Sequence, residues 1–87
     1  MEDQAEFAVI GRRLGAIRKT FGAGTQKDWA EKHGFRPTQW NNWEHGTRRI
    51  PIECAVLLCD NYGLTLDYVY RGRRDGLAGT AAKTLRD

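Results

Sequence analysis

The stretch GFRPTQWNNWEHGTRR, residues 34–49, decides how this chain is expected to fold. It holds two of the three tryptophans of the sequence, with two adjacent asparagines set between them. Trp40 and Trp43 are three residues apart, so in a helix they lie on the same face. Indole rings on one face favour burial, and the intervening amides then point away from the core. The stretch therefore predicts a helix with a buried aromatic side and an exposed polar side.

Signals that start and stop helices surround this stretch. Pro37 suits a first helical position, because the N–H that proline lacks has no partner there, and Gly46 closes the helix. Upstream, Thr25 and Asp28 have the spacing of a capping box, and that helix runs through QKDWAEKH to Gly34. Two helices this short need a shared core, as in a helix-turn-helix. That core would come from Trp29, Ala30, Phe35, Trp40 and Trp43.

The rest of the chain also has helical periodicity, and no segment alternates for long enough to predict a strand. An apolar stripe that includes Leu14 and Ile17 predicts a helix from Glu2 or Ala5 to Thr20. Two further helices are expected from Pro51 to about Tyr62 and over LDYVYR, residues 66–71. We therefore expect an all-α, compact five-helix domain over residues 1–72. Residues 73–87 are expected to form a short C-terminal tail, whose order the sequence leaves open.

The composition of the chain limits the classes of protein it can belong to. It has 87 residues, enough for one domain, and a net charge of +3. Residues 1–10 carry three acids and no base, whereas residues 11–72 carry ten Lys or Arg against six acids, which suits a nucleic-acid partner. No run of 18 apolar residues predicts a membrane span, and the first residues do not resemble a secretion signal, so a cytoplasmic protein is expected.

Metal binding and catalysis have no support in the sequence. Cys54 and Cys59 are five residues apart, and neither they nor His33 and His45 have the spacing of a zinc site. No glycine-rich phosphate loop, HExxH or GxSxG motif occurs. We expect no metal, no cofactor and no enzymatic activity. The two histidines are expected at the surface, at the ends of helices.

The exposed side of the helix over residues 37–45 has side chains that suit double-stranded DNA. Asn and Gln pair with adenine and Arg pairs with guanine in the major groove, where such a helix places its N-terminal half. Helix N-termini and basic loops bind phosphate. The candidate DNA-binding residues are Thr25, Gln26, Lys27, Arg36, Thr38, Gln39, Asn41, Asn42, Arg48 and Arg49. Three alternatives stay open: a merely solvated helix face, a polar loop, and tryptophans that stack on unpaired bases.

Taken in order, the segments TQ, WA, WEHG and LDYVYRG resemble the Cro/C1-type (Xre-like) helix-turn-helix family over residues 10–72. The resemblance implies five helices, a dimer on DNA and the third helix in the major groove. It also implies a phosphate contact for Gln26, base-reading positions for Thr38, Asn41 and Asn42, and an ion pair between Arg18 and Glu44. The chain departs from the family where Arg36 replaces the usual Ser or Thr cap and where tryptophans replace aliphatic residues at positions 29, 40 and 43.

The sequence thus predicts a sequence-specific transcriptional regulator of the phage-repressor type, bound to operator DNA as a homodimer. Val56, Leu57 and the tail beyond Gly72 are candidates for the dimer contact, because they are apolar and off the expected buried stripe. Two alternatives remain. The chain could be the antitoxin of a toxin–antitoxin pair, or a protein-interaction module that no longer binds DNA.

Overall fold

The computed structural model describes residues 6–85, and this part of the chain contains helices and no strand. The helices are α1 (Ala8–Phe21), α2 (Gln26–Lys32), α3 (Pro37–His45), α4 (Ile52–Tyr62), α5 (Leu66–Arg71) and α6 (Gly79–Thr84). The expected all-α class is confirmed, with six helices in the described residues where five were expected. The expected helix start at Glu2 or Ala5 lies outside the described residues, as do residues 86–87 of the expected tail.

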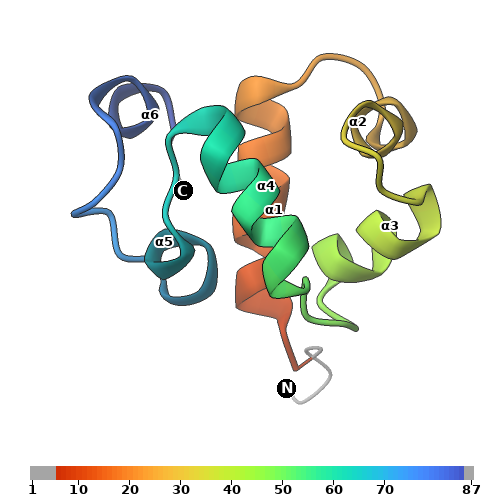
Figure 1. Cartoon of the computed structure of the whole chain (residues 1–87). Helices are drawn as coiled ribbons and strands as arrows, with labels where there is room; N and C mark the ends of the chain where they lie inside the picture. Colours follow the sequence, from red (N-terminus) through yellow and green to blue (C-terminus); the bar gives the residue numbers. More distant parts are fainter. Residues whose placement is uncertain (1–5, 86–87) are drawn as a thin grey trace.

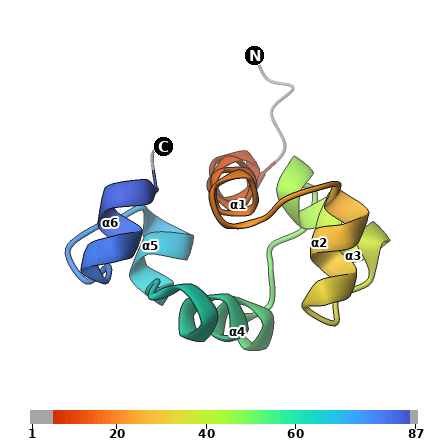
Figure 2. The same cartoon turned by 90° about the horizontal axis from the view of Figure 1, so that it is seen from above.

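Helices α1 and α4 lie in the middle of the molecule, with α2 and α3 on one side and α5 and α6 on the other (Figure 1). Seen from above, α1 and α4 face each other across the centre (Figure 2). The core between them includes the fully buried Leu14, Ile17 and Leu58. The radius of gyration is 12.2 Å, which matches the roughly 12 Å expected for a compact chain of this length.

The helix caps that the sequence predicts are present in the structure. The backbone N–H of Asp28 donates to Thr25 Oγ1 over 3.1 Å, and the backbone N–H of Thr25 donates to Asp28 Oδ2 over 3.5 Å. Two otherwise unpaired N–H groups of α2 are satisfied in this way. Gly34 in the α2–α3 turn and Gly46 after α3 both have a positive φ, of 81° and 82°, which is strained for any residue with a Cβ. The predicted bounds of α2 and α3 are therefore confirmed.

Glycines let α1 approach α3 at unusually short range. A Cβ on Gly11 would collide with the backbone carbonyl group of Glu44 and would lie 2.9 Å from the carbonyl oxygen of Trp43. Gly15, one turn further along α1, faces the Glu44 carboxylate. At the start of α1, the backbone N–H of Phe7 donates to the carbonyl oxygen of Gly46 over 3.0 Å. Small residues on α1 therefore fix the position of α3 against the rest of the domain.

Replacing Gly11 by alanine should destabilise the protein although alanine favours helix. The gain in helix propensity is about 1 kcal/mol, but the new methyl group meets backbone atoms that cannot move aside without separating α1 from α3. We expect the free energy of unfolding to fall by about 1–2 kcal/mol, measured by urea denaturation followed through tryptophan fluorescence. Gly79 is the matched control, because a Cβ there meets nothing within 4 Å. An unchanged or raised stability of G11A would contradict the close approach.

The segment beyond Gly72, which was predicted as a tail of open structure, contributes α6 to the core. Ala81 and Leu85 are each 1 % exposed. The backbone N–H of Ala78 donates to the carbonyl oxygen of Gly63 over 2.9 Å. The Arg74 guanidinium donates to the carbonyl oxygens of Ala82 and Leu85 at the end of α6, both at 2.9 Å. Residues 73–85 thus pack with the five preceding helices and do not project from them.

None of the described helices is a candidate membrane span. The longest described helix, α1, has 14 residues, and no helix within residues 6–85 combines the length and the apolar character that a membrane span requires.

Candidate nucleic-acid interface

Helix α3 has the two different sides that its sequence predicts. Trp40 is 0 % and Trp43 is 5 % exposed, so both indoles belong to the core. On the other side, Thr38 and Gln39 are exposed, and Asn41 and Asn42 are half-exposed. The side chains of these four residues make no hydrogen bond to other described residues, so their polar groups are available to a ligand.

Aromatic packing behind α3 fixes which side of the helix faces outward. The rings of Phe35 and Trp40 lie parallel, with centroids 5.9 Å apart, and Trp43 meets Trp40 edge-on at 6.0 Å. Trp29 of α2 packs on Trp40 with a centroid distance of 5.8 Å. Such contacts add to the burial of large apolar surfaces. Because the rings are enclosed by the protein, they do not offer a stacking platform for unpaired bases.

A hydrogen-bonded carboxylate ties α1, α2 and α3 together at Glu44. Arg18 of α1 donates to it twice, from Nε to Oε1 over 2.9 Å and from Nη2 to Oε2 over 2.8 Å. Trp40 Nε1 donates to Oε1 over 2.6 Å, and the Gln26 side chain is near enough to help lower the pKa of this carboxylate. The side chains of Arg18 and Glu44 are 16 % and 13 % exposed. The Arg18–Glu44 pair that the family resemblance implied is therefore present.

The pKa of Glu44 lies below its usual value. Burial alone would raise this pKa, but the hydrogen bonds from Arg18 and Trp40, the charge of Arg18 and the nearby Gln26 amide together outweigh the cost of burial. The carboxylate thus stays ionised and holds α3 in position. The pKa of Arg18 is raised, chiefly by its hydrogen bond to Glu44.

At the N-terminus of α2, two of the three predicted phosphate contacts have partners inside the protein. Thr25 Oγ1 accepts the backbone N–H of Asp28, and the Gln26 side chain interacts with Glu44, whose pKa it helps to lower. The Asp28 carboxylate also brings a negative charge to this helix end. Lys27 is exposed and has no ion pair within the described residues. Of these three residues, Lys27 is the one whose charged side chain is unpaired within the described residues.

At the N-terminus of α3, Arg36 occupies the cap position without capping the helix. Its side chain makes no hydrogen bond to the free N–H groups of the first turn, as expected for a side chain that carries only donors. Arg36 is exposed. Its guanidinium is therefore free to meet a base or a phosphate beside Thr38 and Gln39.

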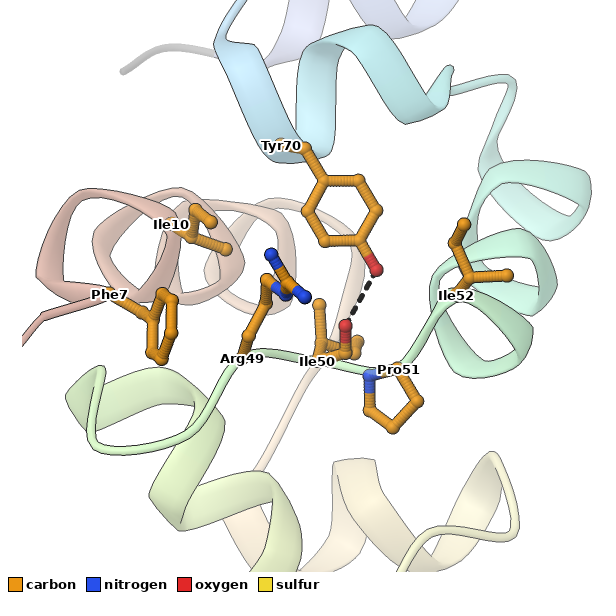
Figure 3. A pocket seen from close by; sticks show the side chains of 7 residues that line it. All are labelled: Phe7, Ile10, Arg49, Ile50, Pro51, Ile52 and Tyr70. Carbon is orange, nitrogen blue, oxygen red and sulfur yellow. Dashed lines mark hydrogen bonds between the residues drawn. The ribbon is translucent and has the colours of Figure 1, made fainter.

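The two arginines after α3, both predicted to contact phosphates, differ in their surroundings. Arg48 is exposed and follows α3 directly. The Arg49 guanidinium instead lies 5.7 Å from the centre of the Phe7 ring, in a hollow that Ile10 and Tyr70 also line (Figure 3). Cation–π attraction to the Phe7 ring, together with the open side of the hollow, explains why the Arg49 side chain points there. Arg49 is thus turned toward α1 and α5, and its contact with phosphate stays a prediction.

The sequence-based list of DNA-binding candidates left out two cations on α1 that lie near the end of α3. Arg12 and Lys19 are exposed, have no ion pair within residues 6–85, and line a hollow with Gly15, Ala16 and Glu44. Because Glu44 belongs to α3, this side of α1 adjoins the end of α3. The signal in the sequence was the spacing of Gly11 and Gly15, which places α3 against this side of α1.

The two histidines differ from one another in the structure. His45 is exposed at the end of α3, as expected, with Nδ1 3.0 Å from the carbonyl oxygen of Asn41. His33, expected at the surface, is half-buried. Its Nδ1 lies 2.8 Å from the carbonyl oxygen of Trp29, and its Nε2 lies 2.7 Å from the hydroxyl of Tyr62. His33 therefore links the end of α2 to the end of α4. The spacing of residues near His33 does not predict this contact.

No group of three or more His, Cys, Asp or Glu residues in the described part of the chain is arranged to hold a metal ion. Cys54 and Cys59 are both free thiols, and burial raises the pKa of each.

Comparison with known proteins gives no match: no family model, curated protein or solved structure is significantly similar to this chain.

Proposed function

We propose that this chain is a sequence-specific DNA-binding transcriptional regulator that acts in the cytoplasm and has no enzymatic activity. In this proposal α1–α5 correspond to the five helices of a Cro/C1-type domain, and α2 and α3 are its helix-turn-helix. Helix α3 enters the major groove, where Thr38, Gln39, Asn41 and Asn42 meet base edges. Arg36, Lys27 and Arg48 neutralise phosphates on either side.

A single observation carries the proposal: the burial of Trp40 and Trp43 leaves a row of unbonded polar side chains on the outer side of α3. A solvated helix face usually mixes acids and bases, whereas this face has no acid between Arg36 and Asn42. Exposed cations lie on the neighbouring segments, with Lys27 on α2, Arg48 after α3, and Arg12 and Lys19 on α1. A polar row bordered by bases is complementary to base edges bordered by phosphates.

Fluorescence anisotropy with a labelled 30-base-pair random duplex tests the proposal at its simplest level. We expect binding in the micromolar range at low salt that weakens steeply as salt rises, because bound phosphates release their counterions. A protein-interaction module on the same scaffold would show no such binding. Absence of DNA binding at low salt, with a correctly folded protein, would remove the proposal.

Arg36→Ala should weaken DNA binding without loss of stability, because the Arg36 side chain is exposed and caps nothing. Loss of one phosphate contact lowers the slope of log affinity against log salt by about 0.9, and loss of a guanine contact costs about 1–3 kcal/mol at the specific site. Arg73→Ala removes the same charge from an exposed position beyond α5 and serves as the control. Equal binding of the two variants across a salt titration would show that Arg36 has no special role.

A further inference from the structure

The hollow beside the loop between α3 and α4 has the lining of a small-molecule site. Its volume is about 660 Å³, and its walls are mostly apolar and aromatic (Figure 3). Ligand pockets in proteins commonly have volumes of about 300–1,000 Å³ and apolar walls with a few polar groups that orient the ligand. The lining residues are Phe7, Ile10, Arg49, Ile50, Pro51, Ile52 and Tyr70. The hollow thus has room for a small ligand with an apolar body.

Arg49 is the one charged residue among those that line the hollow, and its charge has no partner there. Its guanidinium lies 5.7 Å from the centre of the Phe7 ring and forms neither an ion pair nor a hydrogen bond with another residue in the range 6–85. Because Arg49 is exposed, a ligand can reach it from water. Apolar walls beside a cation lower the effective dielectric constant, so they strengthen its attraction for an anion.

The groups around Arg49 favour a ligand with a single negative charge. The pKa of Tyr70 is raised, chiefly by burial, while the nearby charge of Arg49 lowers it and that of Glu53 raises it. Both charges therefore lie near this end of the hollow, and Glu53 would repel a dianion. The Tyr70 hydroxyl donates to the carbonyl oxygen of Ile50 over 2.6 Å, so it has no proton left for a ligand (Figure 3). Arg49 is thus the donor, and its fork fits the two oxygens of one carboxylate.

We propose that this hollow binds a small monocarboxylate with an apolar chain or ring, whose carboxylate pairs with Arg49 and whose apolar part packs between Phe7 and Tyr70. A neutral ligand of the same shape would cover the guanidinium without pairing with it, which costs free energy. The site goes beyond the proposed function and does not depend on it, because binding of the carboxylate is measured without DNA.

Titration of the isotopically labelled whole chain with sodium octanoate, followed by NMR, tests the proposal. We expect saturable shifts of the backbone amide signals of the lining residues, with a dissociation constant of about 1 mM or less. Arg49→Ala should raise this constant at least about tenfold, because it removes a charge-assisted pair. Arg73→Ala removes the same charge from an exposed position outside the hollow and is the matched control. Circular dichroism checks that each variant is folded.

Changes in the ligand provide a second arm that needs no protein variant. 1-Octanol lacks the charge and should bind at least about tenfold more weakly than octanoate. Hexanoate is shorter by two CH₂ groups and should bind up to about tenfold more weakly, because less apolar surface is buried. Octyl phosphate, a dianion above about pH 8, should also bind more weakly than octanoate, because Glu53 repels the second charge.

Four results would overturn the proposal. The first is the absence of saturable shifts up to about 10 mM octanoate. The second is equal binding of octanoate by Arg49→Ala and the wild type. The third is binding of 1-octanol or octyl phosphate that is as tight as that of octanoate. The fourth is an octanoate affinity that falls as protein concentration rises, since this would show that a second copy of the chain occupies the hollow.

Discussion

Replacing Glu44 by alanine is expected to lower the free energy of unfolding by about 3–5 kcal/mol. The substitution leaves the Arg18 guanidinium, whose side chain is 16 % exposed, without its bidentate partner, and it leaves Nε1 of the fully buried Trp40 without its acceptor. Such a loss is a large part of the stability of a small domain, which is about 5–15 kcal/mol in total. Urea denaturation followed by tryptophan fluorescence measures it. Glu31→Ala, at an exposed position of α2, should stay within about 0.5 kcal/mol of the wild type.

The same carboxylate should make stability depend on pH in a defined direction. Because the pKa of Glu44 is lowered in the folded state, its contribution is complete above the unfolded pKa of about 4.3 and is lost as pH falls through the folded pKa. The difference in unfolding free energy between the wild type and Glu44→Gln should therefore be largest near neutral pH and shrink below about pH 4. A difference that stays constant from pH 7 to pH 3 would show that the charge of Glu44 contributes nothing.

Replacing Asn41 and Asn42 together by alanine is expected to abolish most sequence-specific binding. An amide that pairs bidentately with adenine contributes about 1–3 kcal/mol of discrimination, so each substitution should lower operator affinity about 5-fold to 140-fold. Binding to random DNA should change little, because neither side chain carries a charge. Asn61→Ala, at an exposed position next to the last residue of α4, is the matched control.

The outcome that would contradict this prediction is a double variant that binds its operator as tightly as Asn61→Ala does. The stability of the double variant shows whether Asn41 and Asn42 contact DNA or support the fold. The side chains of Asn41 and Asn42 have no hydrogen bond within residues 6–85, so the double variant should unfold at nearly the same urea concentration as the wild type. A loss of DNA binding accompanied by unfolding would instead indicate a structural role for these amides.

Local signals predicted much of this fold, because caps and helical spacing act between residues close in sequence. The Thr25–Asp28 box, Pro37, Gly46 and the tryptophan spacing placed α2 and α3 correctly. Helix α6 was missed because its stability comes from long-range contacts and not from its own periodicity. These contacts include the hydrogen bond from the backbone N–H of Ala78 to the carbonyl oxygen of Gly63. An isolated helix of 6 residues has no independent stability.

The candidate site was predictable where the direction of a side chain follows from helix geometry. Burial of Trp40 and Trp43 was confirmed because their spacing alone fixes the inner side of α3. Arg49 lies in a loop, where no periodicity determines direction, and the Phe7 ring that it meets is far away in sequence. His33 was misjudged for the same reason, since its partner Tyr62 belongs to another helix.

Selection of bound sequences from a random DNA pool tests the central claim most directly, that the outer side of α3 reads base pairs. The account predicts enrichment of one motif made of two inverted half-sites, with centres about 10 base pairs apart, and loss of that motif when Asn41 and Asn42 are replaced by alanine. A pool that stays random after repeated selection, or a motif that survives the double replacement unchanged, would contradict it.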